Sequence, residues 1–273
     1  MTAARGVVAA LRLYLAVAAM AYQRRLAYRT ANLAGLFTNA VFGVLRTAVF
    51  LALFQAQSVV AGYTAQEMVT FSWLMQAMIM VVQLWGWFEV EETIRTGDVV
   101  SDLARPFSYL GYWLAQDLGR AAYFVLYRGV PIFLLGYLTM GMLLPGSPLT
   151  WLAFLLSLTL ATVINFAWRF ALNLTAFWTT DARGLVNLGG GFMSAVSGFL
   201  VPLSFFPAPL GAVLALLPFA GIIQTPADVF MERVTGPALL LALGQQALWA
   251  VVMLLGVQAV VVAATRRLVV QGG

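Results

Sequence analysis

Residues 237–264 read PALLLALGQQALWAVVMLLGVQAVVVAA, an apolar run without a single charged side chain. A helix of this length exceeds the roughly 20 residues that cross the hydrocarbon core of a bilayer. Similar runs recur along the chain, which is 62% hydrophobic and only 9% charged, with a mean hydropathy of +0.92. Because a soluble domain cannot cover so much apolar surface, the sequence predicts an all-α polytopic membrane protein with one domain over residues 1–273.

Six membrane-spanning helices are predicted from these runs. The third starts after Pro106, ends near Leu144 and contains Pro131, which predicts a kink because proline has no backbone N–H to donate. The other five are expected at about Asn32–Phe54, Ala65–Phe88, Leu149–Trp178, Gly184–Val201 and Pro237–Ala264.

The charges of the connecting segments predict the orientation. Residues 1–29 contain five arginines and no carboxylate, whereas the links at 58–63 and 145–148 are uncharged. Since arginine-rich segments stay in the cytoplasm, both termini and the links at 89–106 and 179–183 are expected there. Residues 1–29 are expected to form an amphipathic interfacial helix, and a cleaved signal peptide is the alternative. The terminal arginines are Arg5, Arg12, Arg24, Arg25, Arg29, Arg266 and Arg267.

The residue types that are missing exclude several kinds of chemistry. The chain has no His, Cys or Lys. Without His or Cys, zinc, haem and thiol sites lack their usual ligands, so no metal or cofactor is expected in this chain. Without Lys there is no phosphate-binding Walker A motif, so the chain is not expected to be an enzyme that hydrolyses ATP by itself. Membrane topology explains the basic pI near 9.9, and no nucleic-acid partner is expected.

Residues 89–106 read EVEETIRTGDVVSDLARP and contain five of the ten carboxylates of the chain. Charged residues at helical spacing predict one short helix, Gly97 its end, and Asp98 the N-cap of a second that stops before Pro106. Such a helix–break–helix element offers a partner protein a shaped cytoplasmic surface, and a hydrated loop is the alternative. The residues expected to couple to an ATPase are Glu89, Glu91, Glu92, Arg95, Gly97, Asp98, Asp102 and Arg105.

The link at 202–234 lies outside the cytoplasm by the count of spans, yet it is rich in Leu, Phe and Ala. Its prolines divide it into pieces too short to cross a bilayer. The sequence therefore predicts re-entrant helices that enter the outer leaflet and return, packed against protein. An amphipathic loop exposed to lipid is the alternative.

Arginines inside the predicted spans are weaker candidates for a translocation pathway. An arginine at the centre of a bilayer costs about 2.5–3.5 kcal/mol on insertion scales. Arg46, Arg128 and Arg169 are therefore expected either to meet an anionic headgroup or substrate, or to bond helix-end carbonyls or Asp117, or to reach the surface.

Two further groups are candidates for the pathway or for a subunit interface. Phe71 and Trp73 are deep enough in the second span to line a path for a flat cation, although generic packing also explains them. Small residues at four-residue spacing let helices approach closely, either at a mobile seam or in ordinary packing. This small-residue face consists of Gly190, Ser194 and Gly198.

The stretches IRTGDVVSDLARPFSYLGYWLAQDLGR (94–120) and FLVPLSFFPAPLGAVLALLPFAGIIQTPADVF (199–230) resemble permease subunits of bacterial type-two ABC exporters. The resemblance covers essentially the whole chain and is greatest to the ABC-2 group linked to drug or viologen efflux. It implies a permease dimer, of identical or related chains, in the bacterial inner membrane and in contact with membrane lipids. It also implies two copies of a separate ABC ATPase that bind ATP and Mg, and outward transport of a drug-like or lipid-like substrate.

Two other classes of function were weighed against this one. A secondary transporter or channel usually needs carboxylates near the middle of the membrane, and none is expected at the centre of a span. A membrane-embedded enzyme needs clustered catalytic groups, for which the chain offers neither His nor Cys.

Overall fold

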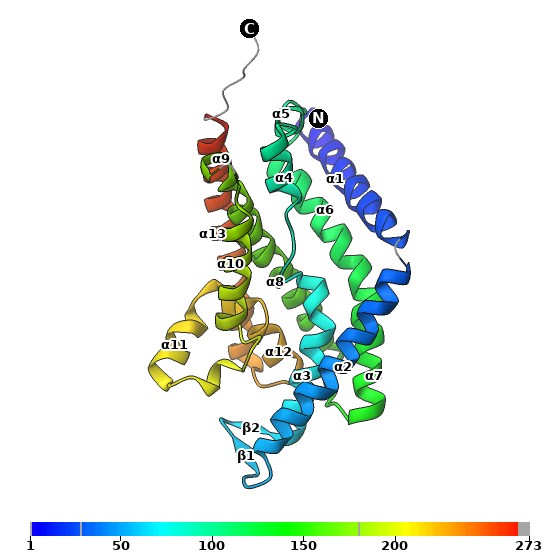
Figure 1. Ribbon diagram of the computed structural model, residues 1–273, viewed down its shortest axis with the longest axis vertical. Helices are drawn as coiled ribbons and strands as arrows, with labels where there is room; N and C mark the ends of the chain where they lie inside the picture. Colours follow the sequence, from blue (N-terminus) through cyan, green and yellow to red (C-terminus); the bar gives the residue numbers. More distant parts are fainter. Residues whose placement is uncertain (1, 28, 180, 267–273) are drawn as a thin grey trace.

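The computed structural model describes residues 2–27, 29–179 and 181–266, and these residues are almost entirely helical (Figure 1). A two-residue hairpin, β1 (Val59–Val60) and antiparallel β2 (Tyr63–Thr64), marks one end of the molecule. The helices are α1 (Thr2–Leu26), α2 (Arg29–Leu53), α3 (Ala65–Val82), α4 (Glu89–Thr96), α5 (Val99–Leu103), α6 (Tyr109–Phe124), α7 (Val130–Met140), α8 (Pro148–Leu174), α9 (Ala176–Thr179), α10 (Arg183–Val196), α11 (Ala208–Leu216), α12 (Gln224–Phe230) and α13 (Gly236–Thr265).

Five helical segments within the described residues are long and apolar enough to cross a membrane: 32–53, 65–82, 109–140, 148–179 and 236–265. They confirm five of the predicted spans to within a few residues at most ends. The fifth span along the chain, predicted at Gly184–Val201, is not among them because α10 stops at Val196 after 14 residues. Gly198 then adopts a positive φ of 90°, a conformation that an α-helix does not contain.

Proline accounts for the irregular turn in the third span. A π-helical turn, Val125–Gly129, joins α6 to α7, and Pro131 follows it directly. Proline offers no N–H to the helical ladder and crowds the preceding turn, so one wider turn accommodates it. The predicted kink is therefore observed as a π-helical turn within a continuous helix.

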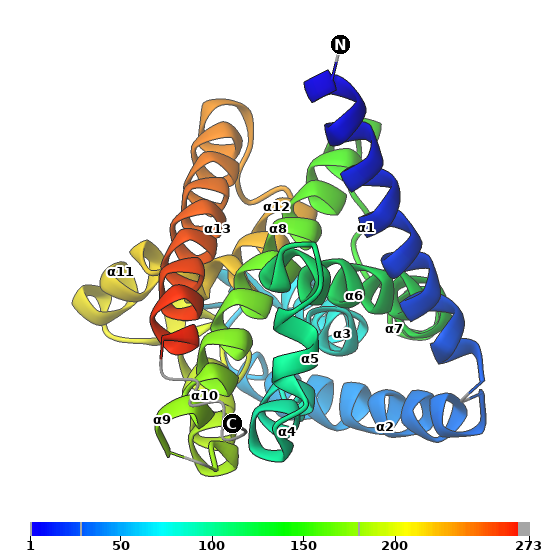
Figure 2. The same cartoon turned by 90° about the horizontal axis from the view of Figure 1, so that it is seen from above.

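The second span is shorter than predicted and forms the centre of the bundle. Figure 2 shows α3 end-on, surrounded by α2, α6, α7 and α8. Most of its side chains are buried, among them Phe71, Trp73 and Met75. It ends at Val82, not at Phe88, because Gln83 takes a left-handed backbone conformation, and an irregular segment leads to α4.

The predicted N-terminal helix is present and packs along α6 (Figure 1). The approach is close because Gly119 of α6 faces the backbone of Ala18, where a side chain would collide. The hydroxyl of Tyr14 accepts a hydrogen bond from the backbone N–H of Ser108 at 3.3 Å. Its position on a membrane surface stays a prediction. The side chains of Arg5 and Arg29 and the whole of Arg267, used to predict orientation, lie outside the described residues.

The 202–234 segment is divided into short helices, as its prolines predict. Two 3₁₀ turns, Leu203–Phe205 and Pro218–Gly221, alternate with α11 and α12. The two helices differ in environment. α12 packs against α8 and is mostly buried, whereas α11 projects from the bundle with Leu210 and Leu216 exposed (Figure 1). Entry of this segment into a leaflet stays a prediction.

Candidate functional site

The helix–break–helix predicted at 89–106 forms one end of the molecule, at the top of Figure 1. α4 ends at Thr96 and Gly97 is its C-cap, with a φ of 85° that strongly favours glycine, and α5 follows at once. Asp98 occupies the N-cap position of α5, as predicted, but its side chain makes no capping hydrogen bond. Its carboxylate instead accepts a bond from the hydroxyl of Thr96 at 2.7 Å, because its backbone is already helical and turns the side chain back toward α4. We call residues 89–106 the α4–α5 element.

Most of the predicted contact residues are accessible on this element. Glu92, Arg95, Asp98 and Arg105 are exposed, and Gly97 at the bend is exposed as well. Two are half-buried, Glu89 and Asp102. Val100 adds an apolar side chain that is 46% exposed at the tip. The element therefore presents a mixed charged and apolar surface, which is the kind that protein partners bind.

Glu91 differs from its neighbours because its side chain is completely buried. Its backbone N–H donates to Oδ1 of Asn173 in α8 at 2.9 Å. Its carboxylate lies 3.5 Å from Nε of Arg95 and 3.4 Å from Nε of Arg183 in α10. The expectation that Glu91 faces a partner is therefore wrong, since the amphipathic turn of α4 directs it inward. It joins α4 to α8 and α10.

A polar stripe on α8 holds the segment between α3 and α4. Asn165 donates to the carbonyls of Val82 and Gln83 at 2.6 and 3.0 Å, and Asn173 donates to the carbonyl of Trp87 at 3.1 Å. Sequence reasoning missed both asparagines. The signal was available, because Asn165, Arg169 and Asn173 recur every four residues in an otherwise apolar helix and so share one face.

Beneath the α4–α5 element lies a buried ion cluster. Asp117 Oδ1 is 2.9 Å from Nε of Arg120, and Oδ2 is 2.9 Å from Nη2 of Arg169. All three residues are at most 4% exposed. Arg120 also donates to the carbonyls of Met80 and Val81 at 2.7 and 2.9 Å, which belong to the last turn of α3. A guanidinium satisfies the free carbonyls of a helix end and complements its dipole.

The contacts of this cluster decide among the alternatives given for Arg169. Its guanidinium bonds Asp117 and lies 5.0 Å from the ring centroid of Trp87, so it is enclosed by protein. The structural alternative is therefore observed, and the pathway role has no support from its surroundings. Arg169 instead connects α8 to α6 and to the segment that leads into α4.

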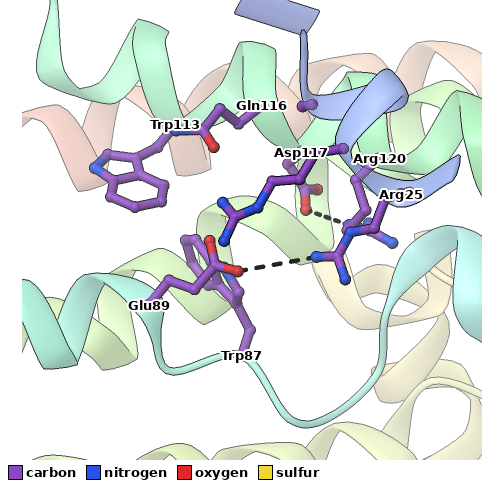
Figure 3. Close-up of a pocket in the computed structure, with 9 residues that line it drawn as sticks. Arg25, Trp87, Glu89, Trp113, Gln116, Asp117 and Arg120 are labelled. Carbon is purple, nitrogen blue, oxygen red and sulfur yellow. Dashed lines mark hydrogen bonds and ion pairs between the residues drawn. The ribbon is translucent and has the colours of Figure 1, made fainter. Parts of the chain in front are cut away.

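Figure 3 shows a small cavity above this cluster, where α1, α4 and α6 meet. Arg25 of α1 points at Glu89 of α4, with 3.8 Å between Nη2 and Oε1. Trp87 and Trp113 form its apolar walls. Burial lowers the pKa of the Arg25 guanidinium, and the negative charge of Glu89 opposes that effect. The N-terminal helix, the α4–α5 element and the ion cluster therefore all contribute residues to the lining of this cavity.

A family model described as ABC-2 family transporter protein matches residues 42–272. The chain belongs to the ABC-2 transporter family. It is a membrane permease of the ABC-2 type, and permeases of this family usually work with a partner ATPase. No curated protein matches the sequence.

In this ABC-2 permease, Arg46 lies in a different environment from Arg169. It donates to the carbonyls of Phe199 and Leu200, just beyond the end of α10, and its guanidinium lies 5.2 Å from the ring centroid of Phe199. It borders a mostly apolar cavity of about 660 Å³ between α2, α3 and residues 199–201. Backbone carbonyls therefore stabilise Arg46, but they belong to the irregular segment after α10 and not to a helix end as predicted. The guanidinium also borders the cavity.

The other pathway candidates of the permease pack within the chain. Phe71 and Trp73 are at most 1% exposed in the core around α3, which is the generic packing considered for them. Ser194 accepts a bond from Nε1 of Trp85 at 2.8 Å, and Gly190 lies under the same indole ring. Gly198 lies beyond α10 against Gln224, so it does not continue the helical face. Their pathway or interface role stays a prediction.

Proposed function

We propose that this ABC-2 permease is the membrane subunit of an ATP-driven exporter, and that the α4–α5 element receives a separate ATPase. The observation that supports the proposal is that the two sides of this element differ. Its outer side is exposed and charged, while Glu91 and Glu89 tie its inner side to α8, α10 and α1. A force on α4 would thus reach three helices of the bundle.

The energy source in this proposal is a partner subunit. The chain has no lysine for a Walker A motif, so ATP and Mg are assigned to two copies of an ABC ATPase. A second permease, identical or related, completes the assembly in the bacterial inner membrane. Both termini and the α4–α5 element face the cytoplasm in this arrangement, because the start of α1, the end of α13 and the element lie at the same end of the molecule (Figure 1) and residues 1–29 contain five arginines and no carboxylate.

A hydrophobic or amphipathic substrate, drug-like or lipid-like, fits the apolar cavity beside Arg46. The cavity is large enough for a drug-sized molecule and has few polar groups, which include Asn39 and Gln76. An ion-coupled transporter would instead need a carboxylate that is free to exchange its ion. Asp117 is a buried carboxylate within a membrane-spanning segment, but arginines occupy both of its oxygens.

The proposal is tested by co-expressing the permease with the ATPase encoded beside it and measuring co-purification and ATP hydrolysis. The double variant Glu92→Arg/Asp98→Arg reverses two exposed charges and leaves the buried Glu91 in place. We expect it to insert normally and to lose most ATPase binding. Glu232→Arg, an exposed reversal near the start of α13, is the control for a charge reversal away from the element, although it also removes the bonds that Glu232 accepts from Gly146 and Thr150. Equal binding by all three proteins, or no complex with wild type, would refute the assignment.

A further inference from the structure

The cavity in Figure 3 has an excess of positive charge. Three arginines line it, Arg24 and Arg25 from α1 and Arg120 from α6, against two carboxylates, Glu89 and Asp117. Arg169 adds a fourth guanidinium because it shares the carboxylate of Asp117 with Arg120. Four cations thus face two anions. Arg24 is exposed and Arg25 half-buried, but Arg120 and Arg169 are buried with the single carboxylate of Asp117, and an excess of buried charge is costly without a counter-ion.

The hydrogen-bond donors in this region are not all used. Arg120 is satisfied by Asp117 and by the carbonyls at the end of α3. Arg169 is 3% exposed, yet its Nε and Nη1 have no hydrogen-bond partner among the described residues. The pair between Arg25 and Glu89 is loose at 3.8 Å, compared with the 2.9 Å contacts of Asp117. The loosely paired Arg25 lines the cavity, whereas Arg169 is not among the lining residues and is connected to the cavity through Asp117 and Trp87.

The surroundings favour a ligand that belongs to the membrane. Trp87 and Trp113 line the cavity, and tryptophan is enriched where a bilayer meets water. The same pair of helices, α1 and α6, borders an apolar groove of about 670 Å³ lined mainly by alanine, leucine and tyrosine side chains. The cavity itself measures about 30 Å³, which admits a small charged group and not a whole drug-sized molecule.

We infer that the cavity between α1, α4 and α6 is a phosphate-binding site that accepts the headgroup phosphate of an anionic membrane lipid. The phosphate oxygens bond Arg24 and Arg25 and offset the charge that Asp117 leaves uncompensated. Basic pockets between helices near a membrane surface recognise lipid headgroups through this chemistry. Because Arg25 is also the partner of Glu89, a bound phosphate competes with the α4–α5 element for the same guanidinium.

The test uses the purified permease in nanodiscs of phosphatidylcholine, to which phosphatidylglycerol or inorganic phosphate is added at constant ionic strength. We expect phosphatidylglycerol to raise the midpoint of thermal unfolding, and Arg24→Gln/Arg25→Gln to lose at least half of that rise. Arg24→Gln alone changes an exposed side chain and serves if the double variant does not fold. Arg12→Gln, exposed on the same helix but outside the cavity, should keep the full rise.

The source of the phosphate is read from the two additions. A rise with inorganic phosphate that the variants lose supports the site and assigns it to a soluble anion. No rise with either addition, or an equal rise in wild type, Arg24→Gln/Arg25→Gln and Arg12→Gln, overturns the inference. Glu89→Gln removes the competing carboxylate, so its rise should exceed that of wild type. None of these measurements requires the ATPase, so their failure is distinguishable from failure of the proposed exporter function.

Discussion

Replacing Asp117 with asparagine removes the only carboxylate, among the described residues, that contacts both Arg120 and Arg169. The amide has nearly the same volume, so the change tests charge and not packing. One amide oxygen still accepts a bond, but the amide NH₂ group now faces a guanidinium, which is also a donor. Two buried cations are left without their shared counter-ion.

The expected loss of stability follows from the burial of the three side chains and from the lengths of their contacts. Both contacts measure 2.9 Å, and the three side chains are at most 4% exposed. Removing one partner from a buried ion pair costs about 3–5 kcal/mol. At roughly 2–4 °C per kcal/mol, Asp117→Asn should lower the midpoint of thermal unfolding by about 6–20 °C. The assay is thermal unfolding of the purified permease in one detergent.

Two further variants make this result interpretable. Asp181→Asn changes an exposed carboxylate in a loop and should alter stability by less than about 0.5 kcal/mol. Arg169→Met, combined with Asp117→Asn, removes the excess cation and should be more stable than Asp117→Asn alone. The reasoning is refuted if Asp117→Asn unfolds at the same temperature as Asp181→Asn, or if the double variant gains nothing.

Three other substitutions test the packing and the electrostatics of the fold. Gly119→Ala places a methyl group against the backbone of Ala18, so α1 should separate from α6. The chain has no cysteine of its own, so a pair of cysteines introduced across the α1–α6 contact should form less disulfide in this variant than in the wild-type background. Burial raises the pKa of Asp228 to about 6, so the folded state binds this proton more readily than the unfolded chain. The free energy of unfolding should therefore rise as the pH falls from about 7 to about 4, and Asp228→Asn should show a weaker dependence over that range. Trp85→Phe keeps the ring but loses the 2.8 Å bond to Ser194, at a cost of about 1 kcal/mol that a lower unfolding midpoint measures.

The ends of the helices show which features of the fold can be predicted from neighbouring residues alone. Proline and glycine interrupt a helix in most contexts, because proline lacks an N–H donor and glycine tolerates a positive φ. Pro131 and Gly97 could therefore be interpreted without knowing their neighbours in space. The irregularity predicted at Pro131 is observed as a π-helical turn in a continuous helix, and the helix end predicted at Gly97 is observed at the end of α4. The end of α3 was missed because Gln83 has no such property. Its left-handed conformation is accompanied by bonds from Asn165 of α8 to the carbonyls of residues 82 and 83, far away in the sequence.

Hydropathy alone identifies this chain as a helical membrane protein, because it is summed over consecutive residues and does not depend on which helices are neighbours in space. The sequence also located the α4–α5 element, since the charges and the glycine that define it are adjacent. Which of those charges are accessible to a partner depends on how the helices pack. Glu91 and Glu92 are neighbours in sequence, yet one is fully buried between α8 and α10 and the other is exposed. Likewise Asp117 pairs with Arg169, which is 52 residues away in the sequence. Such pairings depend on which helix faces lie together, and helix packing, not local composition, sets that.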